Sequence, residues 1–376
     1  MREKLERLRL VRTESVGPVT YRRLLARFPS PAEALDALPA LARAGGRATT
    51  PRIPSAAEVE REYAAVTRMG GQFLFLDTPG YPEFLAQLPD APSAIAVLGD
   101  VSLLSARSVG IVGARNASAN GMRFAEHLGA DLTERLVVVS GLARGIDAAA
   151  HTGALRAGKT IAVIPGGLDV PYPPENAALQ ERIAETGAVV AEAPLGTAPL
   201  GRHFPKRNRI IAGLVLGLVV IEAAPRSGSL LTARLANEAG RELFGVPGSP
   251  LDPRSKGAND LIRQGAHLLD CAEDVFANLP DHPARQGLGR DPLFTRGQTG
   301  FAEPPPVWDE AMSEAELAHA RAEILALLGP EGARVDEIAC RCQLSSAVIT
   351  AAVTELELAG RVETLPGNRI ARCEDL

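Results

Sequence analysis

Four apolar segments of strand length recur between residues 108 and 249, and each ends in a turn rich in glycine or serine. A helical pattern follows each turn, and this alternation predicts a parallel, doubly wound α/β sheet. The turns are Gly113–Ser118, Ser140–Gly145, Pro165–Gly167 and Arg226–Ser229. Because the carboxyl ends of parallel strands meet at one edge of a sheet, we expect these turns to line one ligand-binding edge.

This predicted edge combines accessible backbone with many cations. Glycines let a ligand approach the backbone, and helix N-termini present free N–H groups to anions. The cations in or beside the turns are Arg115, Arg144, Lys206, Arg207, Arg209 and Arg226. We therefore predict a phosphate-binding edge. The sequence has neither the GxGxxG dinucleotide fingerprint nor a Walker A motif, so we predict no nucleotide cofactor.

The segment 203–209 places one aromatic ring among basic side chains. Phe204 offers a base a stacking surface, and the neighbouring cations neutralise phosphates, which is the chemistry that single-stranded nucleic acid needs. The alternative is that Phe204 packs in the core beneath a solvated basic loop. Aromatic residues make up only 4% of the chain, so an aromatic residue among basic side chains favours the nucleic-acid interpretation. We predict a glycine-lined cleft with a single aromatic side chain.

Two further sequence patterns predict whether the protein binds a metal ion and in which cellular compartment it resides. Asp147 and His151 have helical i, i+4 spacing, which suits a metal site or an acid–base pair. No third ligand is evident, and we favour an Asp near a helix N-terminus and a surface or satisfied His. The four cysteines form no CxxC pair, so we predict no metal. Unpaired cysteines without a signal peptide or a bilayer-spanning run predict a cytoplasmic protein.

The N-terminal segment is locally basic, although the whole chain has a net charge of −5. Residues 1–30 hold eight Lys/Arg and three Glu, a local net charge of +5. Two short helices around Val16–Val19 resemble a helix-hairpin-helix unit, whose turn amides bind a DNA phosphate. The alternative, slightly favoured because a single hairpin is a weak signal, is a small helical domain with a solvated basic face.

The C-terminal part begins with a change of composition. Residues 281–312 are rich in Gly and Pro and predict a linker. After it, Ser313 and Glu316 form a capping-box pair, and three helices with a Pro-Gly hairpin predict a winged helix. Residues 313–376 hold six Arg and eleven Asp/Glu, a net charge of −5, and the third helix, Ser346–Leu358, has no Lys or Arg. This charge favours a protein-contact or structural role over reading of duplex DNA.

Six sequence blocks resemble the bacterial DNA-processing protein A (DprA/Smf) family. They are IVGARNAS, SGLARGIDAAAH, IPGGLDVPYPPEN, FPKRNRIIAG, EAAPRSGSLLTAR and VPGSPLDPRSKGANDLI, in order across residues 81–270. The resemblance implies an extended, mostly parallel Rossmann-like sheet with a helical domain before it and a winged helix after it. We place a sterile-alpha-motif-like domain at 1–68, the Rossmann-like domain at 69–280, the linker at 281–312 and the winged helix at 313–376.

The same resemblance implies a function. Members of the family bind single-stranded DNA, protect incoming strands in natural transformation (competence) and load the recombinase RecA, including past single-strand-binding protein. They dimerise through the Rossmann-like domain, and we expect a homodimer near Ala258–Leu269. No catalytic reaction is implied, and neither a cofactor nor a membrane partner.

The resemblance also implies a strand-binding site drawn from all four turns and from the basic segment. Its residues are Gly113, Arg115, Ser118, Ser140, Gly141, Arg144, Gly166, Gly167, Phe204, Lys206, Arg207, Asn208, Arg209, Ser227, Gly228 and Ser229. Arg202 stands near the place where some relatives carry a lysine, although Arg and Lys are not equivalent. We expect Arg115 and Arg209 each to contact a backbone phosphate.

A second resemblance points to an enzyme. Rossmann-like hydrolases of nucleoside monophosphates share the turn Pro165–Gly167, but they continue PGGxGT with a catalytic acid on the next helix. This chain reads PGGLDVPYPPE, so the Gly-Thr is missing and two prolines precede Glu175. Because that acid is missing from its place, we predict that the protein is not an enzyme.

Overall fold

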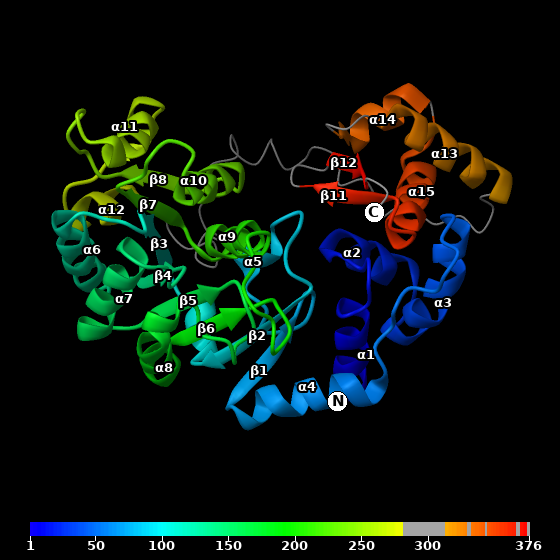
Figure 1. Ribbon diagram of the computed structural model, residues 1–376, viewed down its shortest axis with the longest axis horizontal. Coiled ribbons are helices and arrows are strands. Elements are labelled where there is room, and N and C mark those ends of the chain that lie inside the picture. The colour runs from blue at the N-terminus through cyan, green and yellow to red at the C-terminus, as the bar shows by residue number, and fades with distance from the viewer. Residues whose placement is uncertain (281–312, 329–331, 343, 366–368, 374–376) are drawn as a thin grey trace, which may run out of the picture. The chain divides into compact units, whose positions relative to one another are not determined.

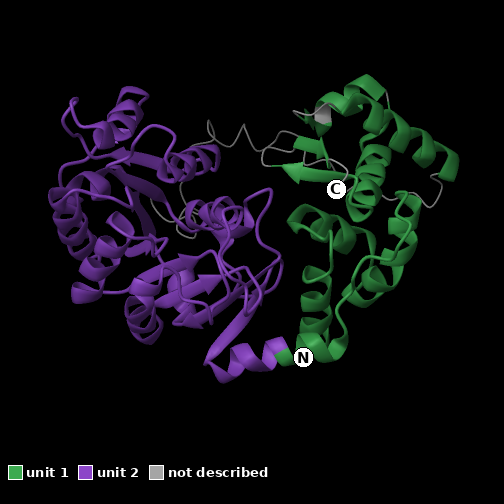
Figure 2. Cartoon of the chain, viewed as in Figure 1, with its two compact units in different colours: residues 1–61, 289–376 green, residues 62–288 purple. Residues whose placement is uncertain are grey.

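The computed structural model describes residues 1–280, 313–328, 332–342, 344–365 and 369–373 (Figure 1). The predicted linker, residues 281–312, and the predicted Pro-Gly tip of the C-terminal hairpin, residues 366–368, lie outside the described residues. The chain divides into two compact units (Figure 2). One contains residues 1–61 and 289–376, and the other contains residues 62–288.

Residues 62–288 are built on one nine-stranded sheet with the order β1-β2-β6-β5-β4-β3-β7-β8-β9. The strands are β1 (Gly71–Phe75), β2 (Ala94–Gly99), β3 (Ser108–Gly113), β4 (Val137–Ser140), β5 (Thr160–Ile164), β6 (Ala188–Ala191), β7 (Gly217–Ile221), β8 (Glu242–Gly245) and β9 (His267–Leu268). From β6 to β9 all neighbours are parallel, whereas β2 is antiparallel to both β1 and β6. The predicted mostly parallel, Rossmann-like sheet is confirmed.

The central strands are apolar throughout because helices cover both faces of the sheet. Val138 packs with α6 (Ala119–Leu132) and α7 (Ile146–Ala157) on one face. Its neighbour Val139 packs on the other face, with α9 (His203–Leu214) and α10 (Gly228–Glu238). The remaining helices of this unit are α4 (Ala56–Arg68), α5 (Glu83–Ala86), α8 (Ala177–Thr186), α11 (Lys256–Arg263) and α12 (Ala272–Asn278), of which α4 begins in the other unit.

The strand order reverses between β3 and β7. Strands β4, β5 and β6 extend the sheet from β3 in one direction, and β8 and β9 extend it from β7 in the other. The turns that follow β3, β4, β5 and β7 therefore meet at one edge, as the sequence predicts. In doubly wound sheets this reversal opens the crevice in which ligands bind.

The other unit contains two small helical assemblies. At the N-terminus, α1 (Arg2–Val11), α2 (Pro18–Arg27) and α3 (Pro31–Ala44) enclose a core that includes Leu10, Tyr21 and Leu38. Helix α2 begins directly after Gly17 with a proline in its first turn, where the missing N–H of proline costs no helix hydrogen bond. The predicted arrangement of a helix, a Gly-Pro turn and a second basic helix is confirmed.

The C-terminal assembly has the predicted winged-helix order. Its helices are α13 (Glu314–Leu327), α14 (Val335–Cys342) and α15 (Ser346–Leu358), and its strands pair in the order β10 (Ala333–Arg334), β12 (Arg369–Arg372) and β11 (Val362–Leu365). The Ser313 hydroxyl accepts a hydrogen bond from the Glu316 amide at 3.2 Å, which completes the predicted capping box. Within the described ranges, no helix combines the length and apolar character needed to cross a membrane. The cytoplasmic location stays a prediction.

Candidate nucleic-acid interface

A cavity of about 220 Å³ opens at the carboxyl ends of β3, β4 and β5. Each of the three strands contributes through the turn that follows it, and a proline-rich loop and the first turn of α9 complete the wall. The lining residues are Arg115, Asn116, Gly141, Ala143, Arg144, Pro165, Tyr172, Pro173 and Phe204. We call these residues the edge pocket. Of the residues predicted for the site, Arg115, Gly141, Arg144 and Phe204 line it.

Two aromatic rings and one guanidinium meet in the edge pocket. The Arg115 Cζ atom lies 4.8 Å from the centroid of the Phe204 ring, within the range of a cation–π contact. The Tyr172 ring meets Phe204 edge-on, with centroids 5.7 Å apart and an interplanar angle of 67°. Phe204 is half-buried, so it belongs to the pocket wall rather than to the core. The predicted single aromatic is wrong, because Tyr172 supplies a second ring.

Arg144 is an exposed cation in the lining of this pocket. It forms an ion pair with Glu175. A backbone N–H and the Arg144 guanidinium hold the pKa of the Glu175 carboxyl below its ordinary value, so this carboxylate stays ionised. Arg202 and Lys206 are also exposed, at and just before the first turn of α9.

Arg207, in contrast, lies beneath the pocket rather than in it. Its Nη1 donates a hydrogen bond to the Val163 carbonyl at 2.8 Å, and its charge is opposed by Asp147. Burial lowers the pKa of Arg207 to about 10 and raises the pKa of the Asp147 carboxyl. A side chain on Gly141 would place its Cβ only 1.8 Å from Arg207 Nη1, so the turn needs glycine in order to rest on the guanidinium.

The i, i+4 pair Asp147 and His151 divides between different partners. Asp147 accepts a hydrogen bond from the Ala143 amide at 3.3 Å, whereas His151 Nδ1 lies 2.8 Å from the Thr160 hydroxyl. Burial lowers the pKa of His151 to about 3, so the ring is neutral at physiological pH. Asp147 thus lies in the first turn of α7, and His151 is buried and bonded through Nδ1, while its Nε2 has no hydrogen-bond partner in the described part of the chain.

Arg209 and Asn208 also turn away from the pocket. Arg209 Nη2 contacts Glu192 Oε1 at 2.5 Å, and the same guanidinium donates to the Asp90 carbonyl. The Asn208 side chain reaches the Gly228 carbonyl at 3.4 Å. This geometry corrects the expectation that Arg207, Asn208 and Arg209 face a strand directly. The segment belongs to helix α9, and the side chains of all three residues are buried within the protein. Side chains on a helix point in directions set by its 3.6-residue period, so a run of adjacent residues does not face one ligand.

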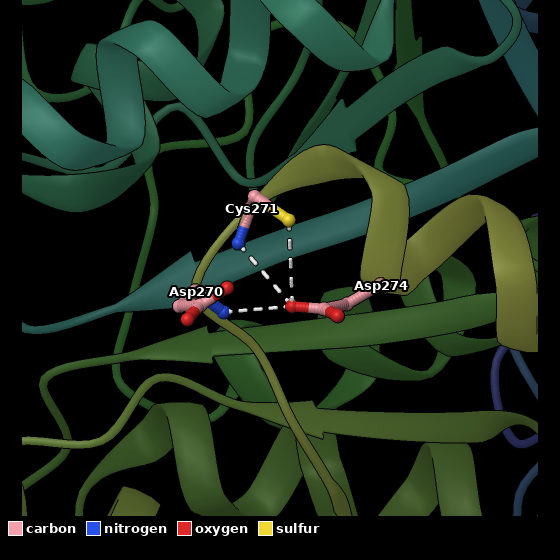
Figure 3. A group of neighbouring side chains, drawn as sticks. All are labelled: Asp270, Cys271 and Asp274. Carbon is pink, nitrogen blue, oxygen red and sulfur yellow. Dashed lines mark hydrogen bonds between the residues drawn. The ribbon is translucent and has the colours of Figure 1, made fainter.

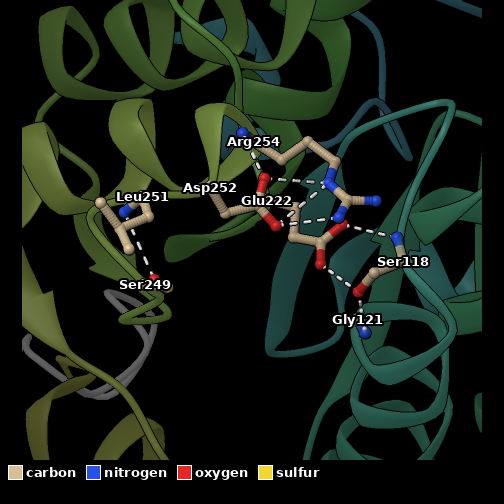
Figure 4. Close-up of polar contacts among 7 residues, drawn as sticks. All are labelled: Ser118, Gly121, Glu222, Ser249, Leu251, Asp252 and Arg254. Carbon is tan, nitrogen blue, oxygen red and sulfur yellow. Dashed lines mark hydrogen bonds and ion pairs between the residues drawn. The ribbon is translucent and has the colours of Figure 1, made fainter.

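The turns on either side of the strand reversal are tied to each other. The Ser118 amide donates to Glu222 Oε2 at 2.8 Å, and the Ser118 hydroxyl bonds the other carboxylate oxygen (Figure 4). The Ser227 and Ser229 hydroxyls bond each other at 2.8 Å, and Gly228 is exposed. Ser118, Ser227, Gly228 and Ser229 therefore lie outside the lining of the edge pocket. Sequence reasoning missed Glu222, whose only signal is an acid directly after an apolar strand.

The four remaining residues of the predicted site, Gly113, Ser140, Gly166 and Gly167, make contacts inside the protein at this edge of the sheet. The Ser140 hydroxyl donates to the Ile111 carbonyl at 2.6 Å, and the Gly167 amide donates to the Thr197 carbonyl at 3.1 Å. A Cβ on Gly113 would lie 1.9 Å from the Ile221 carbonyl oxygen, and one on Gly166 would lie 2.7 Å from that of Thr197. These four residues hold neighbouring segments close together, and they do not line the pocket.

One group of potential metal ligands occurs in the described part of the chain, at Asp270, Cys271 and Asp274 (Figure 3). The Asp274 Oδ2 atom accepts hydrogen bonds from the Asp270 amide at 3.0 Å and from the Cys271 amide at 3.3 Å. The bond from the Cys271 amide is part of the capping box that starts α12, with Cys271 as the N-cap residue. The group is therefore explained by helix capping, and we assign no metal to it.

The fold and the edge pocket define a Rossmann-like protein with an aromatic, cationic ligand edge, carrying a helical domain before the sheet and a winged helix after it. The family model described as DNA recombination-mediator protein A matches residues 72–280. Models of a DprA-like N-terminal HHH domain and of a DprA winged helix domain match residues 1–65 and 309–368. The chain belongs to the DNA recombination-mediator protein A (DprA/Smf) family.

Individual relatives agree with this assignment. The DNA processing protein DprA of Bacillus subtilis is 42% identical over 61% of this chain and 77% of its own length. The crystal structure of DprA from Streptococcus pneumoniae has a TM-score of 0.64 and 35% identity, covering 75% of this chain and 99% of that one. DprA from Helicobacter pylori, whose structure is described as showing a single-stranded DNA binding mode, has a TM-score of 0.50 and 30% identity over 55% of this chain and 94% of that one.

Proposed function

We propose that the protein binds single-stranded DNA through the edge pocket, protects incoming strands and loads RecA onto them in natural transformation and recombination. The observation that carries the proposal is the Arg115 guanidinium stacked on Phe204 inside the cavity. It joins a cation for the backbone to a ring for the base in one place. The single-stranded DNA binding mode described for the H. pylori relative supports the same assignment.

The pocket favours a single strand for a physical reason. An unpaired base can leave its neighbours and stack on Phe204 or Tyr172, whereas a base inside a duplex cannot reach these rings. Stacking is insensitive to base identity because every base has a π face, so binding is independent of sequence. Arg115, Arg144, Arg202 and Lys206 provide the exposed cations for phosphates.

The buried members of the predicted site have a different role in this proposal. Arg207 supports the Gly141 turn from below, and Arg209 ties α9 to Glu192 and Asp90. They position the pocket wall and do not themselves contact phosphate. Removing either one leaves a buried acid or carbonyl without its partner, so the expected loss is in stability.

We further propose that the protein binds without catalysis. A hydrolase of nucleoside monophosphates needs an acid that reaches the substrate. Glu175 is held ionised by Arg144, and Asp147 is buried with its hydrogen bond directed to Ala143. The turn at Gly166 and Gly167 is occupied by close contacts with the segment around Thr197. These contacts support a binding pocket over a hydrolytic one.

A salt titration on oligo-dT tests the pocket. Arg115→Ala should weaken binding and flatten the dependence of log affinity on log salt by about 0.7, because one phosphate contact is lost. Phe204→Ala should lower the affinity by roughly 1–3 kcal/mol, the value of one stacked base, and leave the slope unchanged.

The control is Arg182→Ala, which removes an exposed arginine of α8 that does not line the cavity. Its affinity and slope should match the wild type. The pocket is misplaced if Arg115→Ala keeps the wild-type slope, or if Phe204→Ala binds normally with an unchanged circular dichroism spectrum. The same preparations incubated with nucleoside monophosphates should leave these intact.

RecA loading rests on the description of the family as a recombination mediator. The wild-type protein should speed the assembly of RecA on a strand already covered by single-strand-binding protein, measured as the onset of strand-dependent ATP hydrolysis. Phe204→Ala should lose this effect at concentrations where the wild type is saturating, because loading requires the strand in the pocket. Equal onset times with and without the protein would contradict the proposal.

We also propose the homodimer that the sequence predicts near residues 258–269. Strand β9 is the last strand of the sheet in the described part of the chain. A groove beside it is lined by the apolar residues Pro247, Pro250, Ile262 and Leu268 together with Lys256, Asn259, Asp260 and Arg263. Leu268 is 52% exposed on this edge, and an exposed apolar edge strand favours pairing with another chain. A second copy of this chain is the partner that we propose.

Leu268→Asp should convert the dimer to a monomer, because it places a charge in a buried interface. Sedimentation at micromolar concentration measures the change. The matched control is Met69→Asp, which alters an exposed apolar residue beside β1 at the opposite end of the sheet. A wild-type protein that sediments as a monomer, or a Leu268→Asp variant that remains a dimer, would contradict the proposal.

A further inference from the structure

Helix α15 of the winged helix is buried against the N-terminal domain. The two belong to the same compact unit (Figure 2). Helix α15 packs on α2 and α3. Residues 351–358 are buried without interruption. Leu358 is fully buried and shares an apolar cluster with Tyr21, Leu24 and Leu38. The third helix, which such a fold uses to enter a DNA groove, is therefore committed to another part of the same chain.

The contact is close enough to require particular residues. A Cβ on Gly45 would lie 2.0 Å from the Glu355 carbonyl oxygen, so the end of α3 and the α15 backbone touch at a glycine. Arg47 Nη1 donates to the Leu358 carbonyl at 3.4 Å. These backbone contacts show an interface shaped for α15 rather than a loose encounter.

A carboxylate lies at the centre of the polar part of this interface. Glu357 accepts a hydrogen bond from the Thr20 hydroxyl, and its Oε2 lies 3.6 Å from Arg23 Nη1. Thr20 is fully buried, and the side chains of Arg23 and Glu357 are 13% and 9% exposed. Burial lowers the pKa of Arg23, although Glu357 opposes the shift. On α2, Arg23 thus faces a carboxylate rather than solvent.

The two surfaces also match in charge. Thr20, Arg23 and Arg27 follow each other at spacings of three and four, so they share one face of α2. The facing helix contributes Glu357 to this contact, whereas Glu355 pairs with Arg321 of α13 within the winged helix. Residues 1–30 carry a net charge of +5 and residues 313–376 a net charge of −5, so the attraction extends beyond the contact itself.

We propose that α15 closes the N-terminal domain to DNA. The Glu357 carboxylate holds the hydroxyl of Thr20 and the guanidinium of Arg23, two of the groups on this face that a backbone phosphate would use. The winged helix and a DNA backbone therefore compete for α2. In the closed state neither α2 nor α15 is available to duplex DNA. The proposal uses none of the residues of the edge pocket and does not depend on the function proposed for it.

Two variants of the full chain open the interface. Glu357→Arg reverses the charge that faces Arg23, and Leu358→Asp places a charge in the shared apolar cluster. The probe is a fluorescently labelled blunt duplex at low salt. If about nine in ten molecules are closed, opening raises the apparent affinity for the duplex about tenfold. Faster amide hydrogen exchange in α2 and α15 reports the opening itself.

Two controls make the result specific. Glu363→Arg makes the same change of charge at an exposed position on β11 and should leave duplex affinity near that of the wild type. Adding Arg23→Gln to either open variant should remove the gain, whereas adding Phe204→Ala should keep it. The last comparison separates this proposal from the function of the edge pocket, which is read on oligo-dT.

The proposal is overturned if hydrogen exchange shows α2 open and duplex affinity does not rise. It is also overturned if Glu363→Arg gives the same gain, or if the gain survives Arg23→Gln. Should Leu358→Asp unfold the winged helix, Glu357→Arg decides the matter alone, because its side chain is not part of the apolar core.

Discussion

The buried guanidinium of Arg207 holds together the part of the molecule on which the edge pocket depends. It bonds the carbonyl of Val163 at the end of β5, faces Asp147 at the start of α7 and supports the Gly141 turn after β4. A buried cation is costly unless a counter-charge and hydrogen bonds satisfy it, so these segments are fixed relative to one another. The sheet brings three turns to one edge, and Arg207 sets their spacing.

The cations at this edge of the sheet have two different roles. Arg207 and Arg209 are buried with acidic and carbonyl partners and shape the wall, whereas Arg144 is exposed although it pairs with Glu175. Arg115 lies instead on the Phe204 ring, where a guanidinium keeps donors free for a ligand while its flat face is covered. Tyr172 contacts the same ring edge-on. The rigid backing holds the pocket wall in place before a ligand binds, which lowers the entropy cost of binding.

The sequence predicts what depends on local pattern. The parallel strands, the turns gathered at one edge, the capping box at Ser313 and the limits of α15 all follow from periodicity and turn chemistry. It fails where the answer depends on the phase of a helix or on distant partners. The sequence around Arg207 does not indicate which side chains of α9 are buried. Tyr172 meets Phe204 only because a loop folds back, and Thr20 meets Glu357 across 337 residues of chain. Tertiary contacts of this kind leave no mark in a single sequence.

The central claim is that a single strand lies in the edge pocket with a base against an aromatic ring and a phosphate against Arg115. The structure of the protein bound to a short oligo-dT tests it most directly. The account predicts a thymine stacked on Phe204 or Tyr172 and a backbone phosphate within hydrogen-bond distance of the Arg115 guanidinium. A strand bound at any other surface, with the edge pocket unoccupied and Arg115 still covering Phe204, would contradict it.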